Sequence, residues 1–311
     1  MYLPFVGTKG KPVMGLQPLD LQEWIEVGPS FAEQCNYKNQ LLAHRYADVF
    51  AALAGTRLAQ QEVLDLLLEH LIQRFPDIYR MTGAGKQASI HQASIHNVKS
   101  QQIWRVSEFA ESPLDLAARL VQEDLCLMMP AETGLYELVA ASVCFPLRWK
   151  LREKISQPMG QIHKNVPDYD KRLKTPVDKV FSKLRVGYPG LRFNWSVVDS
   201  PELHLTQEKH VSEFNPEITE DNIEQTLWLR VERQTLRRLP TSGGVLFTIR
   251  TYVYSMAAVM AVDGAAGELA KAIRLLSSNM QKYKNLLPFR VALLSYLDAK
   301  VLLSSGRVCA K

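Results

Sequence analysis

The chain has 311 residues, of which 47% are hydrophobic and 22% are charged, and its formal net charge is +5. This is an ordinary globular composition, sufficient for a sizeable core in one or two domains. No apolar run reaches the roughly 18 residues of a membrane span. The N-terminus, Met1-Tyr-Leu-Pro-Phe, lacks the basic and apolar regions of a signal peptide. We therefore expect a cytoplasmic protein without a membrane partner.

The cysteines are few and far apart, and none forms a Cys-x-x-Cys pair. This spacing predicts reduced thiols and gives no support to a structural zinc site, an iron–sulfur cluster or a disulfide framework. The four are Cys35, Cys126, Cys144 and Cys309.

Positive charge is concentrated between Arg148 and Arg192, where twelve Lys or Arg and four Asp or Glu give +8. Such a segment can face nucleic acid phosphates, an acidic partner protein or the carboxylates of a cofactor. The alternative is a solvated helix face.

The first half of the chain reads as a Pro- and Gly-rich arm over residues 1–37, followed by helices. Apolar residues recur at helical spacing over 38–54, 58–74 and 113–128. An apolar, β-rich run over 138–149 predicts a buried strand. Thr175 as N-cap and Pro176 at the first helical position predict the start of another helix.

Three strands with clear alternation follow. Leu191 to Val197, Leu227 to Glu232 and Val245 to Tyr254 each place apolar and polar residues on opposite faces. The turn Pro240-Thr-Ser-Gly-Gly244 makes the third strand part of a hairpin. We expect one apolar sheet face and one face with several arginines. Helical spacing returns over 263–305, so the predicted fold class is α+β, with helices before and after a central antiparallel sheet.

His163 is the histidine most suited to chemistry, because Pro158 and Pro167 constrain its loop and basic residues surround it. Imidazole is a ligand for heme iron, and arginines suit the heme propionates. The alternative is a histidine that merely caps a turn. No G-x-S-x-G, H-E-x-x-H, G-x-G-x-x-G or Cys/His zinc spacing supports a hydrolase, a zinc protease or a dinucleotide-binding protein.

The run from Trp228 to Pro240 carries more charge than a strand normally tolerates, and Arg230 and Glu232 lie on one face. It is either a solvated strand edge with charges placed against aggregation or the polar wall of a cofactor pocket.

Five segments together resemble the heme-dependent oxidative N-demethylase alpha-subunit family. The longest is Arg230-x-Glu-Arg-Gln-Thr-Leu-x-Arg238-Leu-Pro240. The others are Val121-Gln-Glu-Asp-Leu125, Cys144-Phe-Pro-Leu-Arg-Trp149, Ile162-His163 with Val166-Pro167, and Arg192-x-Asn194-Trp195.

The resemblance implies a heme b monooxygenase with a PAS-like central sheet. Members oxidise a methyl group on a small secondary amine such as dimethylamine, using O₂ and two electrons, and release formaldehyde. Electrons come from a nicotinamide cofactor through flavin and iron–sulfur partner subunits. It also implies an N-terminal arm and helical region over 1–135, a heme-binding sheet over 136–260, and C-terminal helices over 261–311 packed on the same body.

By position in these motifs, His163 is the expected axial ligand of the iron. His204, His210 and Cys144 remain alternatives. Arg192, Arg230 and Arg238 are the expected propionate contacts, and Glu232, Asn194 and Tyr252 are expected in the distal pocket, where they would act in catalysis. The family pattern has glycine at Ser156 and proline at Asn165.

Two other functions fit parts of the sequence. One is a non-catalytic heme sensor or carrier with the same pocket, since a fold does not fix a function. The other is a nucleic-acid-binding module that uses the +8 segment. No recognition motif interleaves aromatic residues with those charges, so we expect no nucleic acid partner.

Overall fold

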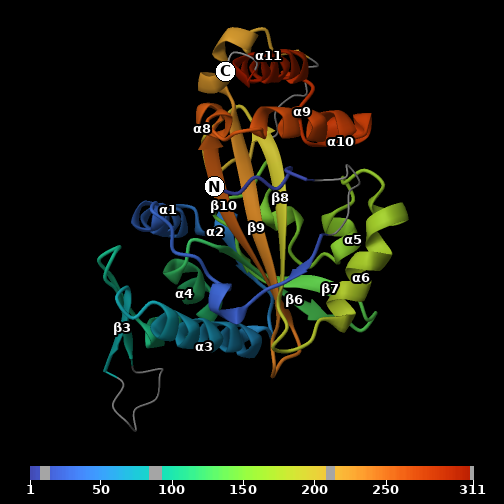
Figure 1. The fold of residues 1–311 in the computed structure, drawn as a ribbon. Coiled ribbons are helices and arrows are strands. Elements are labelled where there is room, and N and C mark those ends of the chain that lie inside the picture. The colour runs from blue at the N-terminus through green and yellow to red at the C-terminus, as the bar shows by residue number, and fades with distance from the viewer. Residues whose placement is uncertain (8–14, 84–92, 208–213, 309–311) are drawn as a thin grey trace.

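A long antiparallel sheet runs through the centre of the protein, with helical layers on both sides (Figure 1). The computed structural model describes residues 1–7, 15–83, 93–207 and 214–308, with side chains to residue 303. Seven strands form the sheet in the order β1-β8-β9-β10-β6-β7-β2. In chain order these are β1 (Gln17–Pro18), β2 (Phe50–Ala52), β6 (Asp124–Pro130), β7 (Tyr136–Ser142), β8 (Gly190–Val198), β9 (Trp228–Arg238) and β10 (Val245–Ser255).

The helices fall into three groups around this sheet (Figure 1). The first precedes it in the chain and consists of α1 (Phe31–His44), α2 (Tyr46–Val49), α3 (Arg57–Arg74) and α4 (Pro113–Leu120). The second lies between β7 and β8 and consists of α5 (Met159–Ile162), the π-helical turn η5 (Tyr169–Leu173) and α6 (Lys174–Lys183). The third is α7 (Ile223–Thr226), α8 (Met256–Met260), α9 (Ala265–Leu275), α10 (Ser278–Tyr283) and α11 (Arg290–Val308).

The remaining regular elements are short. A separate three-stranded sheet consists of β3 (Tyr79–Thr82), β4 (Ser94–Asn97) and β5 (Gln102–Arg105). Single 3₁₀ turns are η1 (Leu21–Glu23), η3 (Val106–Phe109), η4 (Leu151–Glu153) and η6 (Glu220–Asn222). No helix in the described part of the chain is long and apolar enough to cross a membrane.

The two faces of the central sheet have different covers. We call face A the face that carries Arg192, Asn194, Arg230 and Glu232, and face B the opposite one. On face A, Leu236 and Val245 pack with Val177 and Phe181 of α6, whose apolar residues recur every four positions. Face B packs on α1, α3 and α4 at one end and on α8, α9 and α11 at the other.

The sequence expectations hold for most of the long elements. The helix over 58–74 is α3, and the helical pattern over 263–305 becomes α9, α10 and α11. The three predicted strands are β8, β9 and β10, and the hairpin turn lies at 240–244 with Val245 opposite Arg238. Antiparallel pairing throughout, with helices on either side of the sheet in sequence, confirms the α+β class.

One predicted helix is wrong in its second half. The helix expected over 113–128 ends at Leu120, and β6 begins at Asp124. β6 pairs with β10 on one side and β7 on the other, so it is a central strand buried on both faces. Such a strand is apolar without alternation, and the run Leu125-Cys-Leu-Met-Met129 resembles a buried helix equally well.

The predicted helix start at Thr175 is also wrong. The helix α6 begins at Lys174 and follows directly on the π-helical turn η5, so Thr175 lies inside the first turn instead of capping it. Pro176 is still tolerated, because the first N–H groups of a helix have no intrahelical partner.

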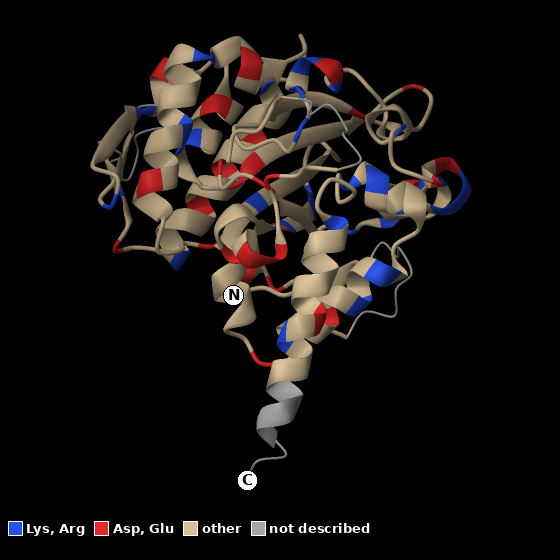
Figure 2. Cartoon of the chain, turned by 90° about the horizontal axis from the view of Figure 1, so that it is seen from above, with Lys and Arg blue, Asp and Glu red and all other residues tan. Residues whose placement is uncertain are grey.

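The exposed cations of the 148–192 segment lie mainly on η5 and α6, on the right of Figures 1 and 2. Those on η5, α6 and the turn that follows are Lys171, Arg172, Lys174, Lys179, Lys183 and Arg185. The helical layer over face A is therefore apolar toward the sheet and basic toward solvent.

Candidate functional site

His163 lies at the end of α5, in the layer that covers face A. Pro158 is the N-cap of α5, and the Lys154 ammonium donates to the Ile162 carbonyl at 2.8 Å. Both the backbone N–H and the ring Nδ1 of His163 lie within hydrogen-bond distance of the Met159 carbonyl, at 3.1 and 3.0 Å. A short helix and a tethered loop thus hold the imidazole in one orientation.

The hydrogen bond at Nδ1 sets the chemistry of this imidazole. A carbonyl only accepts, so Nδ1 carries the proton, and the neutral ring keeps the lone pair of Nε2. Nε2 has no hydrogen-bond partner among the described residues. Burial lowers the pKa of His163, opposed by the Met159 bond and assisted by the positive charges of Arg192 and Lys154. His163 is therefore neutral near pH 7, which is the form that binds a metal.

Tyr169 covers one flat side of this imidazole. The two rings are stacked with their centroids 5.1 Å apart and their planes within 8°. Burial raises the pKa of Tyr169 to about 12, and its hydroxyl is buried without a hydrogen-bond partner in the described part of the chain. The ring therefore limits rotation of His163 and brings an unpaired hydroxyl close to it.

Opposite the His163 layer, face A carries a polar group built around Glu232. Asn194 stands directly across from Glu232, and Arg192 across from Gln234. Glu232 Oε2 accepts hydrogen bonds from Gln234 Nε2 at 2.8 Å and from Asn194 Nδ2 at 3.3 Å. Two amides thereby orient one carboxylate.

Arg192 is the unpaired cation of this group. Its Nε is buried, and no hydrogen bond of its guanidinium is found among the described residues. Burial lowers the pKa of Arg192, and the negative charge of Glu232 opposes this. Its charge also acts on His163, so the α5 layer and face A share one electrostatic environment.

Lys284 completes this group, although no pattern in the sequence pointed to it. It follows α10 and reaches the open edge of β8, where Nζ donates to Asn194 Oδ1 at 3.1 Å and to the Trp195 carbonyl at 2.5 Å. Burial lowers its pKa to about 8, Glu232 opposes this shift, and Arg192 adds to it. Gln234 was also missed, since an amide inside a charged strand carries no distinctive signal.

The other two predicted propionate contacts, Arg230 and Arg238, donate hydrogen bonds to backbone carbonyls of the protein. Arg230 is fully buried and donates to the carbonyls of Phe145 at 2.5 Å and Leu203 at 3.1 Å. Arg238 donates to the Leu184 carbonyl at 2.9 Å and the Gly243 carbonyl at 2.6 Å. Arg238 thus fastens the end of α6 to the hairpin turn, and Arg230 holds the loops at the other end of face A.

The sheet does not bring Tyr252 together with the other predicted residues. In β10 it stands opposite Val231, which places it on face B. Its hydroxyl donates to Glu26, whose other carboxylate oxygen lies 3.2 Å from Arg233 Nε. Tyr252 therefore belongs to a polar network on the side of the sheet away from His163.

The alternative iron ligands differ in how they are held. His204 shares the pattern of His163, because its Nδ1 lies 2.8 Å from the Cys144 carbonyl and its buried Nε2 has no partner in the described chain. Burial raises the pKa of the Cys144 thiol to about 12, so the thiolate that binds iron is disfavoured. His210 lies outside the described residues.

Five of the twelve buried side-chain polar atoms that lack a partner among the described residues lie on face A or in the layer over it. Buried polar atoms normally have hydrogen-bond partners, so a group of them indicates a missing ligand or water. Within the described ranges, those on face A or in the layer over it are Arg192 Nε, Arg230 Nε, Thr251 Oγ1, Tyr169 Oη and His204 Nε2. A neutral imidazole can donate a lone pair to heme iron, and an unpaired guanidinium can donate hydrogen bonds to a heme carboxylate.

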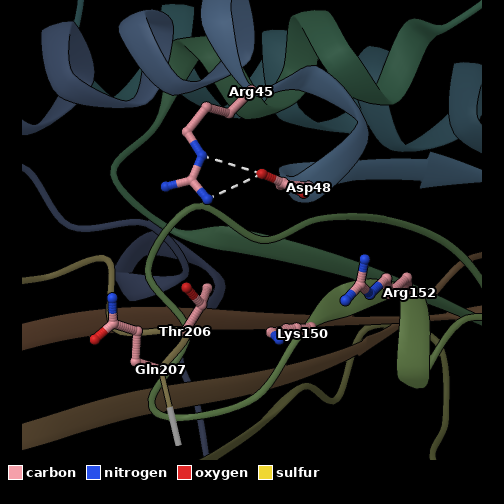
Figure 3. Close-up of a pocket in the computed structure, with 6 residues that line it drawn as sticks. All are labelled: Arg45, Asp48, Lys150, Arg152, Thr206 and Gln207. Atoms are coloured by element: carbon pink, nitrogen blue, oxygen red, sulfur yellow. Dashed lines mark hydrogen bonds and ion pairs between the residues drawn. The ribbon is translucent and has the colours of Figure 1, made fainter.

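Two surface pockets lie outside this group. One of about 280 Å³ lies between α5 and the start of α6 and includes Met159 and Lys174. The other, of about 290 Å³, is shown in Figure 3, where Arg45 pairs with Asp48 across from Lys150 and Arg152. Neither is lined by His163 or Glu232.

No group of three or more His, Cys, Asp or Glu side chains in the described chain could hold a metal ion. A heme iron needs no such group, because the porphyrin supplies four of its ligands and the protein only the axial ones. The chain matches the family described as haem-dependent oxidative N-demethylase, alpha subunit-like, over residues 15–294. It belongs to this family. The resemblance found from the five motifs is therefore confirmed, and the match covers the helices before the sheet as well as β6 to β10.

The family's name gives heme-dependent oxidative N-demethylation as its chemistry. It also describes chains of this family as similar to the alpha subunit, which is one subunit of a larger enzyme.

Proposed function

We propose that this chain binds heme b between face A and the α5–α6 layer, with His163 as the axial ligand, and removes a methyl group from a small N-methyl amine such as dimethylamine. The observation that carries the proposal is the hydrogen bond between His163 Nδ1 and the Met159 carbonyl, 3.0 Å long. It fixes the tautomer in which Nε2 has a free lone pair, as second-shell carbonyls do for metal-bound histidines.

Two further features support a heme pocket on this face. The five core strands stand in the spatial order β7-β6-β10-β9-β8, and the connection from β7 to β8 carries α5 and α6 over face A. This arrangement agrees with the PAS-like fold that the motifs imply. Arg192 offers a half-buried guanidinium, with its Nε buried and without a partner in the described chain, suited to a propionate.

When bound, the heme would supply the oxidation of the methyl group by O₂ with two electrons and two protons, which leaves a carbinolamine and water. The carbinolamine then divides into the demethylated amine and formaldehyde. We assign to Glu232 the binding of the substrate ammonium, because Asn194 and Gln234 occupy only Oε2 and leave Oε1 free among the described groups. Flavin and iron–sulfur partner subunits would deliver the electrons.

The first test is the absorption spectrum of the purified protein with heme, beside His163→Ala and His204→Ala. We expect a Soret band that shifts on reduction, is altered in His163→Ala and is unchanged in His204→Ala. Restoration of the His163→Ala band by free imidazole would identify the lost ligand. The opposite pattern would assign the iron to His204, and no band in any of the three proteins would refute the heme proposal.

A second measurement separates an enzyme from a sensor or carrier with the same pocket. Dimethylamine is added to the heme-loaded protein with O₂ and a chemical reductant, and formaldehyde is measured. Formaldehyde that depends on both the amine and the heme supports the demethylase. Heme binding without formaldehyde, even with the native partner subunits, would favour the sensor or carrier.

A further inference from the structure

Lys284 brings a second cation to the part of face A around Glu232, where Arg192 already lies. Its ammonium donates to Asn194 Oδ1 and to the Trp195 carbonyl, and it lies 5.3 Å from the centre of the Trp195 ring. A lysine has three N–H donors, so one remains available. The side chain is half-buried and comes from the segment between α10 and α11, about ninety residues from its partners.

The charges around Lys284 do not balance. Arg192 and Lys284 are both positive and act on each other, and Glu232 is the one carboxylate in the described chain whose charge acts on both. Neither cation has a carboxylate oxygen of a described residue within 4.0 Å. His163 is neutral near pH 7, so this group holds one surplus positive charge. A surplus charge that is partly removed from water, as on the half-buried Arg192 and Lys284, carries a desolvation cost that a bound anion would offset.

Free hydrogen-bond donors accompany this surplus charge. The guanidinium of Arg192 has no partner among the described residues, and Lys284 keeps its third N–H. Arg192 and Asn194 are two residues apart on the same face of β8, and Lys284 contacts Asn194, so the two cations flank one short stretch of the strand. A carboxylate placed there would receive charge-assisted hydrogen bonds from both.

We propose that Lys284 is a cofactor-binding residue which, together with Arg192, receives a propionate carboxylate of the heme. This inference rests on the proposed function. It adds a contact from the segment between α10 and α11. None of the five motifs that resemble the family includes this segment. The propionate would balance the one surplus positive charge and make the group neutral overall. Glu232 Oε1, which has no partner among the described residues, is then the carboxylate oxygen left for the substrate ammonium.

The test compares heme with heme dimethyl ester, in which both carboxylates are blocked. The dissociation constant of each is measured by Soret titration for the wild type, Lys284→Met and Lys282→Met. Lys282 is exposed on α10, two residues away, and serves as the matched control. We expect Lys284→Met to weaken heme binding by about 10-fold or more, the usual effect of losing a charge-assisted hydrogen bond. Binding of the ester should change by less than about 2-fold, and Lys282→Met should match the wild type.

Lys284 also holds the edge of β8, so a variant that keeps this contact is needed. Lys284→Gln retains an amide donor for the Trp195 carbonyl but has no charge, and far-ultraviolet circular dichroism checks its fold. It should show the same selective loss for heme over the ester. Equal losses for heme and ester in both variants, or no loss in either, would overturn the propionate contact while leaving the heme proposal intact. Failure of the wild type to bind heme would overturn both.

Discussion

Asn194 and Glu232 face each other across β8 and β9, and the amide of Asn194 joins Glu232 to Lys284. Its Nδ2 lies 3.3 Å from Glu232 Oε2, while its Oδ1 accepts from the Lys284 ammonium at 3.1 Å. Because the lysine must meet the oxygen of the amide, the NH₂ group is directed to the carboxylate. The orientation of Glu232 thus depends on a residue of the C-terminal helical segment.

Glu232→Gln should impair the use of the amine and spare the binding of heme. The substitution keeps the shape of the side chain but removes the charge that would hold an ammonium ion. We expect kcat/KM for dimethylamine to fall by about 10- to 100-fold, in line with the loss of a charged hydrogen bond of about 1.5–3 kcal/mol. The Soret band should be unchanged. Formaldehyde release at the wild-type rate would show that Glu232 does not bind the substrate.

Lys284 should make the stability of the heme-free protein depend on pH. Burial lowers its pKa to about 8 in the folded protein, from an ordinary value of 10.5. Between these two pH values the unfolded chain therefore binds more protons than the folded one, so the free energy of unfolding rises with pH. Urea unfolding at about pH 7.5 and about pH 9.5 should show this rise to be larger in the wild type than in Lys284→Met. An identical pH dependence in the two proteins would show that the ammonium is not destabilised by burial.

Tyr252→Phe should affect stability and leave the heme spectrum unaltered, because Tyr252 lies on face B. The change removes the hydroxyl that donates to Glu26. We expect a loss of about 1–2 kcal/mol in the free energy of unfolding, the usual effect of leaving a partly buried acceptor without its partner. Denaturant unfolding and a Soret titration on the same variant measure the two effects. A changed Soret band would return Tyr252 to the heme pocket.

Ser156→Gly should stabilise the loop that precedes α5. Ser156 has a φ of 62°, in the left-handed region that favours glycine. Relief of this conformation should raise the free energy of unfolding by about 0.5–1 kcal/mol. Ser182→Gly, inside α6, is the control and should lower it by a similar amount. A decrease in both variants would mean that Ser156 makes a stabilising contact of greater value than the strain.

Patterns within single strands allowed most of the sheet to be predicted. Leu191 to Val197 alternate because one face of β8 packs on the core, and the turn at Pro240 to Gly244 has the residues that reverse a chain. The helix predicted where β6 lies is wrong because a central strand has no alternation, and its apolar run also suits a helix. Such a run becomes a strand only when neighbouring strands take up its backbone hydrogen bonds.

The pairing between strands decided which predicted residues share a face. The sequence predicted one face with several arginines, but Arg250 stands opposite Arg233 and lies on face B with Tyr252, away from Arg192 and Arg230. The apolar residues of β10 accordingly join Arg230 and Glu232 on face A. Alternation fixes which residues of one strand lie together, whereas a shift of one residue in register would exchange both faces.

Local patterns were thus enough to predict the α+β class, the alternating strands, the constrained loop of His163 and the family resemblance. They did not predict that His163, Arg192 and Glu232 share one side of the sheet, that Tyr252 lies on the other, or that Lys284 joins the first group. Local patterns act over a few residues, whereas strand register and the approach of Lys284 to Asn194 depend on packing between segments far apart in the chain.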